Sequence, residues 1–295
     1  MKANYTRSFS FILIAIAYLT AFGVGSGVLY ALPGIHPLWK LFIADVAATF
    51  VIWLFSLGFK NSSFYDAYWS VAPMVFVFYF VQVALPDADS FRQVLLFIAV
   101  QVWGLRLTLN WARGWPGIRH EDWRYGMLKQ GSSARKLAID WFGIHFFPTV
   151  QVFLGCLPMY PALSLPGNEV NGYDIIAFAI CLSGAMVSLI SDEQLRLFRK
   201  RIKAPGEFMQ GGLWKYSRHP NYLGELLFWC GVYAFGLSAR WDYAWTGVGV
   251  VAMYAMFRLA SIPMMEKHML QKRPEYRNYQ KKTPVFLPIF IKPGN

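Results

Sequence analysis

The sequence predicts an all-α, polytopic integral membrane protein, a bundle of seven or eight transmembrane helices. Three observations support this prediction: 56% of the 295 residues are hydrophobic, only 15% are charged, and the mean hydropathy is +0.35. Soluble domains usually carry about 25% charged residues, so an ordinary cytosolic globule is excluded. A disordered chain is also excluded, because such chains are rich in polar residues.

Long uncharged runs predict the transmembrane segments, since about 20 apolar residues cross the hydrocarbon of a bilayer. No Asp, Glu, Lys or Arg occurs between Arg7 and Lys40, from Ala67 to Pro86, or from Trp141 to Asn168. The first run is too long for a cleaved signal peptide, and more spans follow it. Each span should be helical, because a spanning segment must pair its own backbone groups. We expect the spans near residues 9–31, 38–58, 68–85, 91–110, 139–158, 173–196, 220–238 and 243–262.

Three of these spans are unusual. Residues in or between the first two can bend or interrupt a helix (Gly23, Gly25, Gly27, Pro33 and Pro37), so seven spans with a re-entrant piece is the alternative to eight. The apolar run of the sixth, from Tyr173 to Ile190, continues without Gly or Pro until Pro205. It would be about 46 Å long if it is helical throughout, so its last turns should carry a basic face beyond the bilayer. No linker divides the chain, and we expect residues 1–295 to form a single membrane domain.

The formal charge of +12 is distributed in a way that predicts topology rather than nucleic-acid binding. Three segments, 111–140, 191–219 and 263–295, hold six, seven and seven of the 28 Lys and Arg residues. Basic loops stay in the cytoplasm, so these three segments should share the cytoplasmic side, together with both chain ends. The three cysteines, Cys156, Cys181 and Cys230, lie inside apolar runs and predict neither a disulfide framework nor a metal site.

Ionisable residues at membrane depth cost a few kcal/mol or more and are therefore functional candidates. Ordinary explanations also exist: a snorkelling arginine at Arg106, a hydrogen-bonded core histidine at His145, and a capping or interfacial role for Asp45. Because they cluster on the cytoplasmic side, the six candidates named below together predict a polar cavity open to the cytoplasm. The candidates are Asp45, Asp66, Arg106, His145, Glu225 and Arg258.

The stretch 205–225 carries the most specific pattern. Pro220 suits the first turn of a helix, whose free backbone N–H groups and dipole favour an anion just before it. Asn221 and Glu225, one turn apart, can hydrogen-bond an amide such as nicotinamide. The pattern predicts a phosphate- or carboxylate-bearing cofactor with cytoplasmic loops closing over it; a basic interfacial belt anchored by aromatics is the alternative. Donors for an anion are Lys215, Arg218 and His219, and rings that can stack on the cofactor are Trp214, Tyr216 and Tyr222.

This stretch, with the long helix before it, resembles the steroid 5α-reductase family, whose wider group includes the sterol carbon-14 and carbon-7 reductases. The sequence Arg-His-Pro-Asn-Tyr-Leu-Gly-Glu at 218–225 is close to the signature of that group, and the run 264–290, including Glu266, is similar to its C-terminal segment. The length suits bacterial members. The resemblance is strong over 190–290 and weaker over 106–158, so we expect 60–295 to resemble the reductase core and 1–59 to be additional or divergent.

The resemblance implies NADPH-dependent reduction of a carbon–carbon double bond conjugated to a ketone, as in a 3-oxo-4-ene steroid. It implies that Asn221 and Glu225 hold the nicotinamide and that Asp192, with Arg196 and Arg199, lies near the nucleotide. Lys136 would replace an arginine that contacts phosphate, and Arg199, Arg201 and Lys203 could hold the 2′-phosphate. The predicted cofactor-binding residues are Lys136, Asp192, Arg196, Arg199, Lys203, Trp214, Tyr216, Ser217, Arg218, His219, Asn221, Tyr222, Glu225, Arg258 and Glu266.

The substrate end departs from the family pattern. The resemblance places Asp66, with Tyr65 or Tyr68, near a glutamate that holds the ketone, and it places Trp103 near a tyrosine position. An indole can donate a hydrogen bond but cannot protonate a ketone. We therefore predict that Asp66 in its protonated form or a neighbouring tyrosine stabilises the developing enolate.

Two other functions use related patterns. Membrane methyltransferases of the isoprenylcysteine type, which use S-adenosylmethionine, share the His-Pro and Tyr spacing. A sterol- or lipid-binding protein could keep the scaffold without turnover. The expected partners are an enone lipid and membrane lipid, with no nucleic acid, and the expected location is a bacterial inner membrane with the cofactor site on the cytoplasmic side. The oligomeric state stays open, a monomer included.

Overall fold

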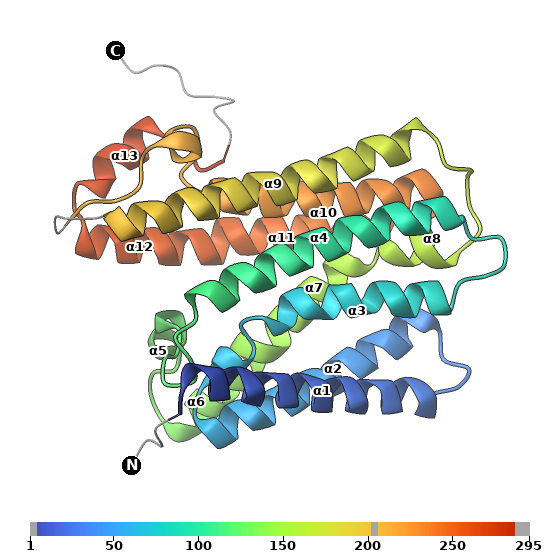
Figure 1. The fold of residues 1–295 in the computed structure, drawn as a ribbon, viewed down its shortest axis with the longest axis horizontal. Helices are drawn as coiled ribbons and strands as arrows, with labels where there is room; N and C mark the ends of the chain where they lie inside the picture. Colours follow the sequence, from blue (N-terminus) through green and yellow to red (C-terminus); the bar gives the residue numbers. More distant parts are fainter. Residues whose placement is uncertain (1–4, 202–205, 287–295) are drawn as a thin grey trace.

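The chain folds as a bundle of helices in a computed structural model that describes residues 5–201 and 206–286. Within these ranges there is no strand, and eight helical segments are long and apolar enough to cross a membrane, which confirms the predicted polytopic all-α fold (Figure 1). The eight segments are α1 (Arg7–Ala31), α2 (Pro37–Phe59), the 3-10 turn Ser62–Phe64 followed by α3 (Tyr68–Gln82), α4 (Ser90–Gly114), α6 (Ser133–Ala138) continuing through the π-helical stretch Ile139–Phe146 into α7 (Phe147–Cys156), α9 (Gly172–Arg201), α10 (Pro220–Ala239), and the span Trp241–Lys272 with α11 (Val248–Met256) and α12 (Ile262–Lys272).

The glycines and prolines of the first two spans do not interrupt them. α1 continues unbroken through Gly23, Gly25 and Gly27, Pro33 lies in the turn after α1, and Pro37 opens α2, where a missing N–H costs nothing. Eight spans therefore replace the seven-span alternative. α9 is helical to Arg201, as the uninterrupted sequence predicts.

The last span is longer than expected, because it extends ten residues beyond residue 262. Its middle is a π-helical turn, Phe257–Ser261, and Pro263 follows directly in the first turn of α12. A π-helical turn shifts the hydrogen-bond register, so the proline is accommodated without ending the helix. Arg258 lies in this turn.

The described parts of the three basic segments, residues 111–140, 191–201 with 206–219, and 263–286, gather at one end of the bundle, at the left in Figure 1. This end, which we call the basic end, carries α5 (Trp123–Leu128), α6, α12, α13 (Tyr276–Lys282) and the 3-10 turn Gly212–Lys215. The opposite end carries α8 (Met159–Ser164). The clustering agrees with the expected topology, in which these segments share one side of the membrane.

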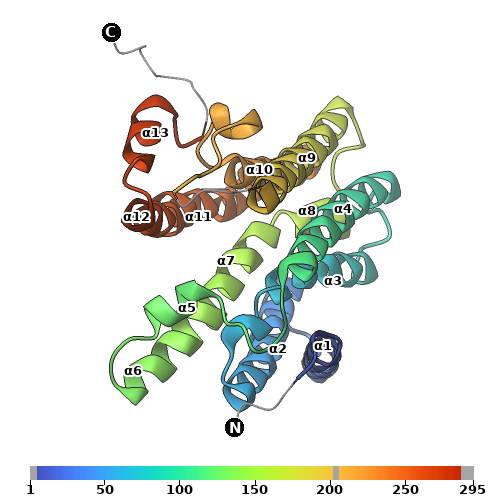
Figure 2. The same cartoon turned by 60° about the vertical axis from the view of Figure 1, so that its left-hand side comes forward.

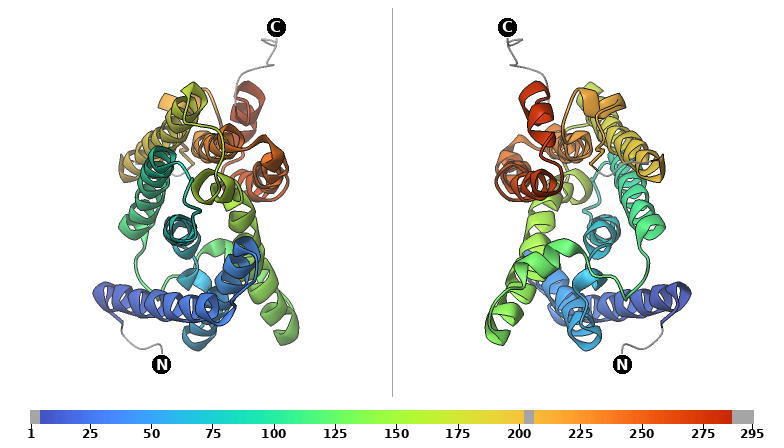
Figure 3. Two further views of the ribbon diagram at one scale, coloured as in Figure 1. Left: turned by 90° about the vertical axis from the view of Figure 1, so that its right-hand side faces the viewer. Right: turned by 90° about the vertical axis from the view of Figure 1, so that its left-hand side faces the viewer.

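Two helices connect the two halves of the bundle. Figures 2 and 3 show α1 and α2 on one side and α9 to α13 on the other. α4 packs against α3 and α9, while α7 packs against α2, α3, α10 and α11. Side chains on α4 and α7 can therefore reach both halves.

α9 and α10 approach so closely that only glycine fits at their contact. A Cβ atom on Gly184 would lie 2.5 Å from the backbone nitrogen of Phe228, and one on Gly224 would lie 2.3 Å from Ser188 Oγ. Small residues at such contacts let membrane helices pack backbone to backbone. The close approach brings Asp192 of α9 next to Asn221 of α10.

Candidate functional site

A buried ion pair links α4 to the start of α10 at the basic end. The guanidinium of Arg106 donates to Glu225 Oε1, and the indole Nε1 of Trp103 donates to Glu225 Oε2 at 2.8 Å. Trp103 also stacks on the ring of Phe228, with centroids 4.6 Å apart. Both oxygens of the Glu225 carboxylate are thus held by residues three apart on α4.

Asp192 of α9 joins the same group of side chains. Its carboxylate lies 3.5 Å from Arg106 Nη1 and accepts hydrogen bonds from Asn110 Nδ2 at 3.1 Å and Asn221 Nδ2 at 3.3 Å. Ser188 Oγ donates to the backbone carbonyl of Asn221 at 2.9 Å. We call this set the three-helix network, and it consists of Trp103, Arg106, Asn110, Asp192, Asn221 and Glu225.

Two buried polar atoms of the three-helix network have no partner among the described residues: Arg106 Nε, a donor, and Asn221 Oδ1, an acceptor. Buried polar groups are nearly always hydrogen-bonded, so each exception requires an explanation. The two residues share Asp192 as a neighbour, which places both atoms in one network. A ligand group that presents one acceptor and one donor would complete it.

The second polar cluster joins the signature at 218–219 to α12 and α13. Arg218 Nε and His219 Nε2 bind Glu266 Oε1 at 2.7 and 3.0 Å, and Gln280 Nε2 binds Glu266 Oε2 at 2.7 Å. Arg218 Nη1 donates to the carbonyls of Gln280 and Thr283 at 2.9 and 2.6 Å. We call Arg218, His219, Glu266 and Gln280 the C-terminal clasp.

The clasp is continued by backbone hydrogen bonds. The amides of Arg218 and His219 donate to the carbonyls of Pro284 and Val285, and Ser217 Oγ donates to the carbonyl of Val285. Tyr279 donates to the carbonyl of Trp214; burial raises its pKa to about 12, so the phenol stays protonated. Arg218 and His219, predicted anion donors, therefore hold the C-terminal segment against the start of α10.

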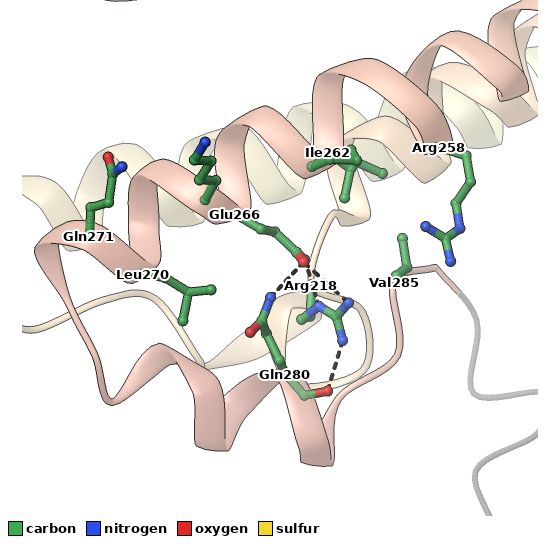
Figure 4. Close-up of a pocket in the computed structure, with 10 residues that line it drawn as sticks. Arg218, Arg258, Ile262, Glu266, Leu270, Gln271, Gln280 and Val285 are labelled. Atoms are coloured by element: carbon green, nitrogen blue, oxygen red, sulfur yellow. Dashed lines mark hydrogen bonds and ion pairs between the residues drawn. The ribbon is translucent and has the colours of Figure 1, made fainter.

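A groove of about 540 Å³ opens beside the clasp (Figure 4). Arg258, from the π-helical turn, and Lys267, from α12, supply positive charge along it. Ile262, Leu270 and Val285 supply its apolar surface. The positive charge along this groove favours an anionic group. Three predicted cofactor residues line it, namely Arg218, Arg258 and Glu266.

The remaining predicted cofactor residues are scattered. Tyr222 stacks between His219 and Phe257, with ring centroids 5.6 and 4.6 Å away, and Trp214 Nε1 donates to the carbonyl of Ser191. Tyr216 and Arg199 are exposed.

Three basic candidates lie apart from the two polar clusters. Arg196 is tied to Glu193 of its own helix. Lys136 lies on α6, which Figures 1 and 2 place across the bundle from α9 and α10. Lys203 lies outside the described residues. The structure therefore does not bring Arg196 or Lys136 to the groove or to the three-helix network.

The substrate-end candidates do not converge on one point. Tyr65 OH bonds Thr149 Oγ1 at 2.8 Å, and Tyr68 OH donates to Asp45 Oδ1 at 2.9 Å. Asp45 is thus a buried partner of Tyr68, and the N-cap of α2 is His36, so the structure excludes the capping or interfacial alternative for Asp45. His145 is fully buried and bonded through both ring nitrogens, to Ser56 Oγ and the carbonyl of Asp140, so the prediction of a core histidine is confirmed.

Asp66 points towards the basic end, where α5 bridges the two halves of the bundle. Tyr125 OH donates to Asp66 Oδ1 at 2.5 Å, while the ring of Trp123 stacks on His268 of α12 with centroids 3.9 Å apart. Burial and the nearby Asp66 carboxylate raise the pKa of Tyr125, so its phenol remains the donor. α5 therefore ties the start of α3 to α12 across the basic end.

Sequence reasoning missed the part that Arg106 and Asn110 play. The sequence marks Arg106 as a functional candidate, with snorkelling to the interface as the ordinary alternative. Its side chain is only 6% exposed and pairs with Glu225 and Asp192, which excludes that alternative. The available signal was the spacing of Trp103, Arg106 and Asn110, which puts three polar groups on one helix face. That spacing does not reveal the partner, because Glu225 lies 119 residues away.

The family described as a protein of unknown function (DUF1295) matches residues 52–283. An uncharacterized protein of Schizosaccharomyces pombe is 29% identical over 262 residues, which are 81% of this chain and 76% of that one. No solved structure matches the chain.

Partial matches extend to enzymes with a printed activity. The 3-oxo-5-alpha-steroid 4-dehydrogenase 1 of Rattus norvegicus is 30% identical over 118 residues, 40% of this chain and 42% of the rat protein. The Homo sapiens protein of the same name is 31% identical over 115 residues, 38% of this chain and 41% of the human one. The chain thus spans about two fifths of these dehydrogenases, and the similarity suggests a membrane oxidoreductase.

Proposed function

We propose that the chain, which belongs to the DUF1295 family, is an NADPH-dependent reductase of a carbon–carbon double bond conjugated to a ketone. The first substrate to test is a 3-oxo-4-ene steroid, since the partial relatives are 3-oxo-5-alpha-steroid 4-dehydrogenases. NADPH would supply the hydride, while the protein supplies binding, orientation and electrostatics.

The single observation that carries the proposal is the unpaired donor and acceptor of the three-helix network. A nicotinamide carboxamide offers one carbonyl oxygen and one NH₂ group. The oxygen would accept from Arg106 Nε, and the NH₂ would donate to Asn221 Oδ1, the two atoms that lack partners. Glu225 then acts by holding Arg106 in place, because both its carboxylate oxygens are already bonded.

The groove beside the clasp suits the phosphates of the cofactor. Arg258 and Lys267 line it, and an arginine guanidinium presents the fork of donors that phosphate oxygens accept. The basic turns of α9, with exposed Arg199 and Arg201, offer further charge for the 2′-phosphate. Tyr125 and Trp123 on α5 would cover the nicotinamide end, because α5 spans the basic end from Asp66 to His268.

The binding experiment measures the melting temperature of the detergent-purified protein with NADPH, NADH or S-adenosylmethionine. A ligand that binds the folded state stabilises it by about 2.7 kcal/mol at 100 times its Kd. We expect stabilisation by NADPH. Stabilisation by S-adenosylmethionine instead would favour the methyltransferase alternative, and an empty, unresponsive site would favour a lipid-binding protein.

The turnover experiment follows NADPH oxidation with progesterone or testosterone in the detergent-purified protein. The product should be the ketone with the 4-ene reduced, identified by mass spectrometry as a gain of two hydrogens. Omission of the steroid is the control for uncoupled oxidation. Binding of NADPH without oxidation in the presence of an enone would contradict the proposed reaction.

A further inference from the structure

Helix α5 is attached to the two halves of the bundle in two different ways. On the side of α3 it is held by hydrogen bonds. Tyr125 OH donates to Asp66 Oδ1 at 2.5 Å. The backbone amide of Asp122, the N-cap of α5, donates to Ser63 Oγ at 3.2 Å. Both acceptors lie just before α3, so these bonds fix α5 to the half of the bundle that contains α1 to α3.

On the side of α12, α5 is held by a pair of stacked rings. The ring of Trp123 lies on the ring of His268, with centroids 3.9 Å apart and planes inclined by 16°. In the part of the chain that the structure describes, no hydrogen bond joins α5 to α12. A stacked pair can separate without leaving a buried polar atom unpaired, whereas separation of Tyr125 from Asp66 would do so. The contact with α12 is therefore the more easily broken of the two, and we call the Trp123–His268 pair the latch.

The latch and the C-terminal clasp lie on different faces of α12. Glu266 and His268 are two residues apart, so their side chains point to nearly opposite sides of the helix. Glu266 holds Arg218 of the clasp, whereas His268 faces α5. A substitution at His268 therefore alters the latch and leaves the clasp in place.

α5 also faces the start of α10, where the three-helix network begins. The guanidinium of Arg124, the residue after Trp123, lies close enough to Tyr222 for its charge to act on that phenol. Tyr222 is half-buried and follows Asn221, whose Oδ1 is unpaired. The seam between α5 and α12 thus lies at the basic end, beside the residues of α10 that are to receive the cofactor.

We propose that the latch closes the entrance to the three-helix network and opens to admit and release the cofactor. This inference rests on the proposed function, in which the cofactor is NADPH. Opening separates the rings of Trp123 and His268, while the hydrogen bonds of α5 to Asp66 and Ser63 stay intact. Because the same rings separate for entry and for exit, the latch slows both steps and leaves the affinity unchanged.

The test compares full-length variants that remove or keep the stack. His268→Ala removes it, and His268→Phe keeps an aromatic ring on Trp123. His120→Ala is the matched control, because it removes an exposed imidazole from the segment before α5 and leaves the latch in place. Stopped-flow measurement of NADPH fluorescence gives the association and dissociation rate constants of each detergent-purified protein, and thermal unfolding shows that each is folded.

Loss of the stack should raise both rate constants by the same factor, about 2–10-fold, the range that one aromatic pair contributes. Their ratio, the Kd, should stay unchanged. His268→Phe and His120→Ala should bind and release NADPH at the rates of the wild type. A side chain that contacts the cofactor would give a different result, because its loss mainly raises the dissociation rate and weakens the affinity.

A second measurement uses the protein without cofactor. Hydroxyl-radical footprinting, read by mass spectrometry, reports the access of water to the ring of Tyr222. His268→Ala should increase the oxidation of Tyr222, since the seam in front of it is open more of the time. Tyr173, which is 73% exposed at the start of α9 at the opposite end of the bundle, should be oxidised equally in the variant and the wild type.

Two results would overturn the latch, and they differ from a failure of the proposed function. If His268→Ala leaves both rate constants at their wild-type values, the stack closes no entrance. If the dissociation rate alone rises, His268 contacts the cofactor and does not act as a latch. If the wild type binds no NADPH, the proposed function fails, and the footprint decides about the entrance: greater oxidation of Tyr222 in His268→Ala supports it, and unchanged oxidation overturns it.

Discussion

The C-terminal clasp and the three-helix network both centre on a glutamate paired with an arginine at the basic end, yet they are completed differently. In the clasp, Glu266 bonds Arg218, His219 and Gln280, and the remaining Arg218 donors meet backbone carbonyls. In the three-helix network, Arg106 Nε and Asn221 Oδ1 are left over.

The difference distinguishes a polar cluster that stabilises the fold from a polar cluster that can bind a ligand. A cluster whose donors and acceptors all pair internally stabilises the fold and offers nothing to a ligand. A cluster with one unpaired donor and one unpaired acceptor destabilises the folded protein until a ligand forms hydrogen bonds with both. The most recognisable residues of the signature, Arg218 and His219, therefore belong to the C-terminal clasp, which stabilises the fold. Asn221, two residues later, belongs to the three-helix network, which can bind a ligand.

The largest effect should follow from breaking the Arg106–Glu225 pair. Arg106→Met leaves the buried Glu225 carboxylate and the half-buried Asp192 carboxylate without their cation, and breaking a buried pair costs about 3–5 kcal/mol. Chemical denaturation would measure the loss, and NADPH should no longer raise the melting temperature. The double variant Arg106→Met with Glu225→Gln should regain part of the stability but not the response to NADPH; regained NADPH binding would contradict the role of Arg106.

The next effect concerns the clasp. Glu266→Gln replaces the carboxylate that holds Arg218 and His219, and we expect a loss of about 1.5–3 kcal/mol, the range for hydrogen bonds to charged groups. Because the clasp only supports the site, kcat should stay within a few-fold of the wild type at a temperature where the variant is folded. A selective collapse of kcat with unchanged stability would place Glu266 in the chemistry instead.

Asn221 should show the opposite pattern from Glu266. Its Oδ1 is unpaired and its Nδ2 makes one long bond, so Asn221→Ala should change the melting temperature little. Loss of a carboxamide contact should raise KM for NADPH and lower kcat together, by about tenfold or more. Asn110→Ala is the control, since it removes the other amide bonded to Asp192 but no unpaired atom. Equal changes in KM for NADPH and in kcat for the two variants would contradict a specific contact between Asn221 and the carboxamide.

The smallest effect should come from Arg196. Its guanidinium is tied to Glu193 on the surface of α9, an arrangement that contributes little to stability. Arg196→Ala should leave the melting temperature and kcat unchanged. The resemblance to steroid 5α-reductases predicts a role near the nucleotide, so a rise in KM for NADPH without a change in KM for NADH would support that role and place the end of α9 beside the 2′-phosphate.

Much of the fold could be predicted because membrane insertion depends on local properties of the chain. Long apolar runs specify the eight spans, and the distribution of Lys and Arg specifies which loops lie together. The predicted end of the last span at residue 262 is wrong, because the helix continues through a π-helical turn ahead of Pro263, and apolar composition does not encode such a turn. The signature around Asn221 and Glu225 could likewise be recognised from a short stretch.

The partners of the polar residues could not be predicted, because they come from segments far apart in the sequence. The sequence allows an interfacial explanation for both Arg106 and Asp45. In the structure, Glu225 of α10 pairs with Arg106, and Tyr68 of α3 donates a hydrogen bond to Asp45. The sequence by itself determined where the chain crosses the membrane and which motif it carries, because both are properties of continuous segments; only the tertiary structure decided which polar atoms are satisfied and which are left for a ligand, because a hydrogen bond needs both of its atoms in place.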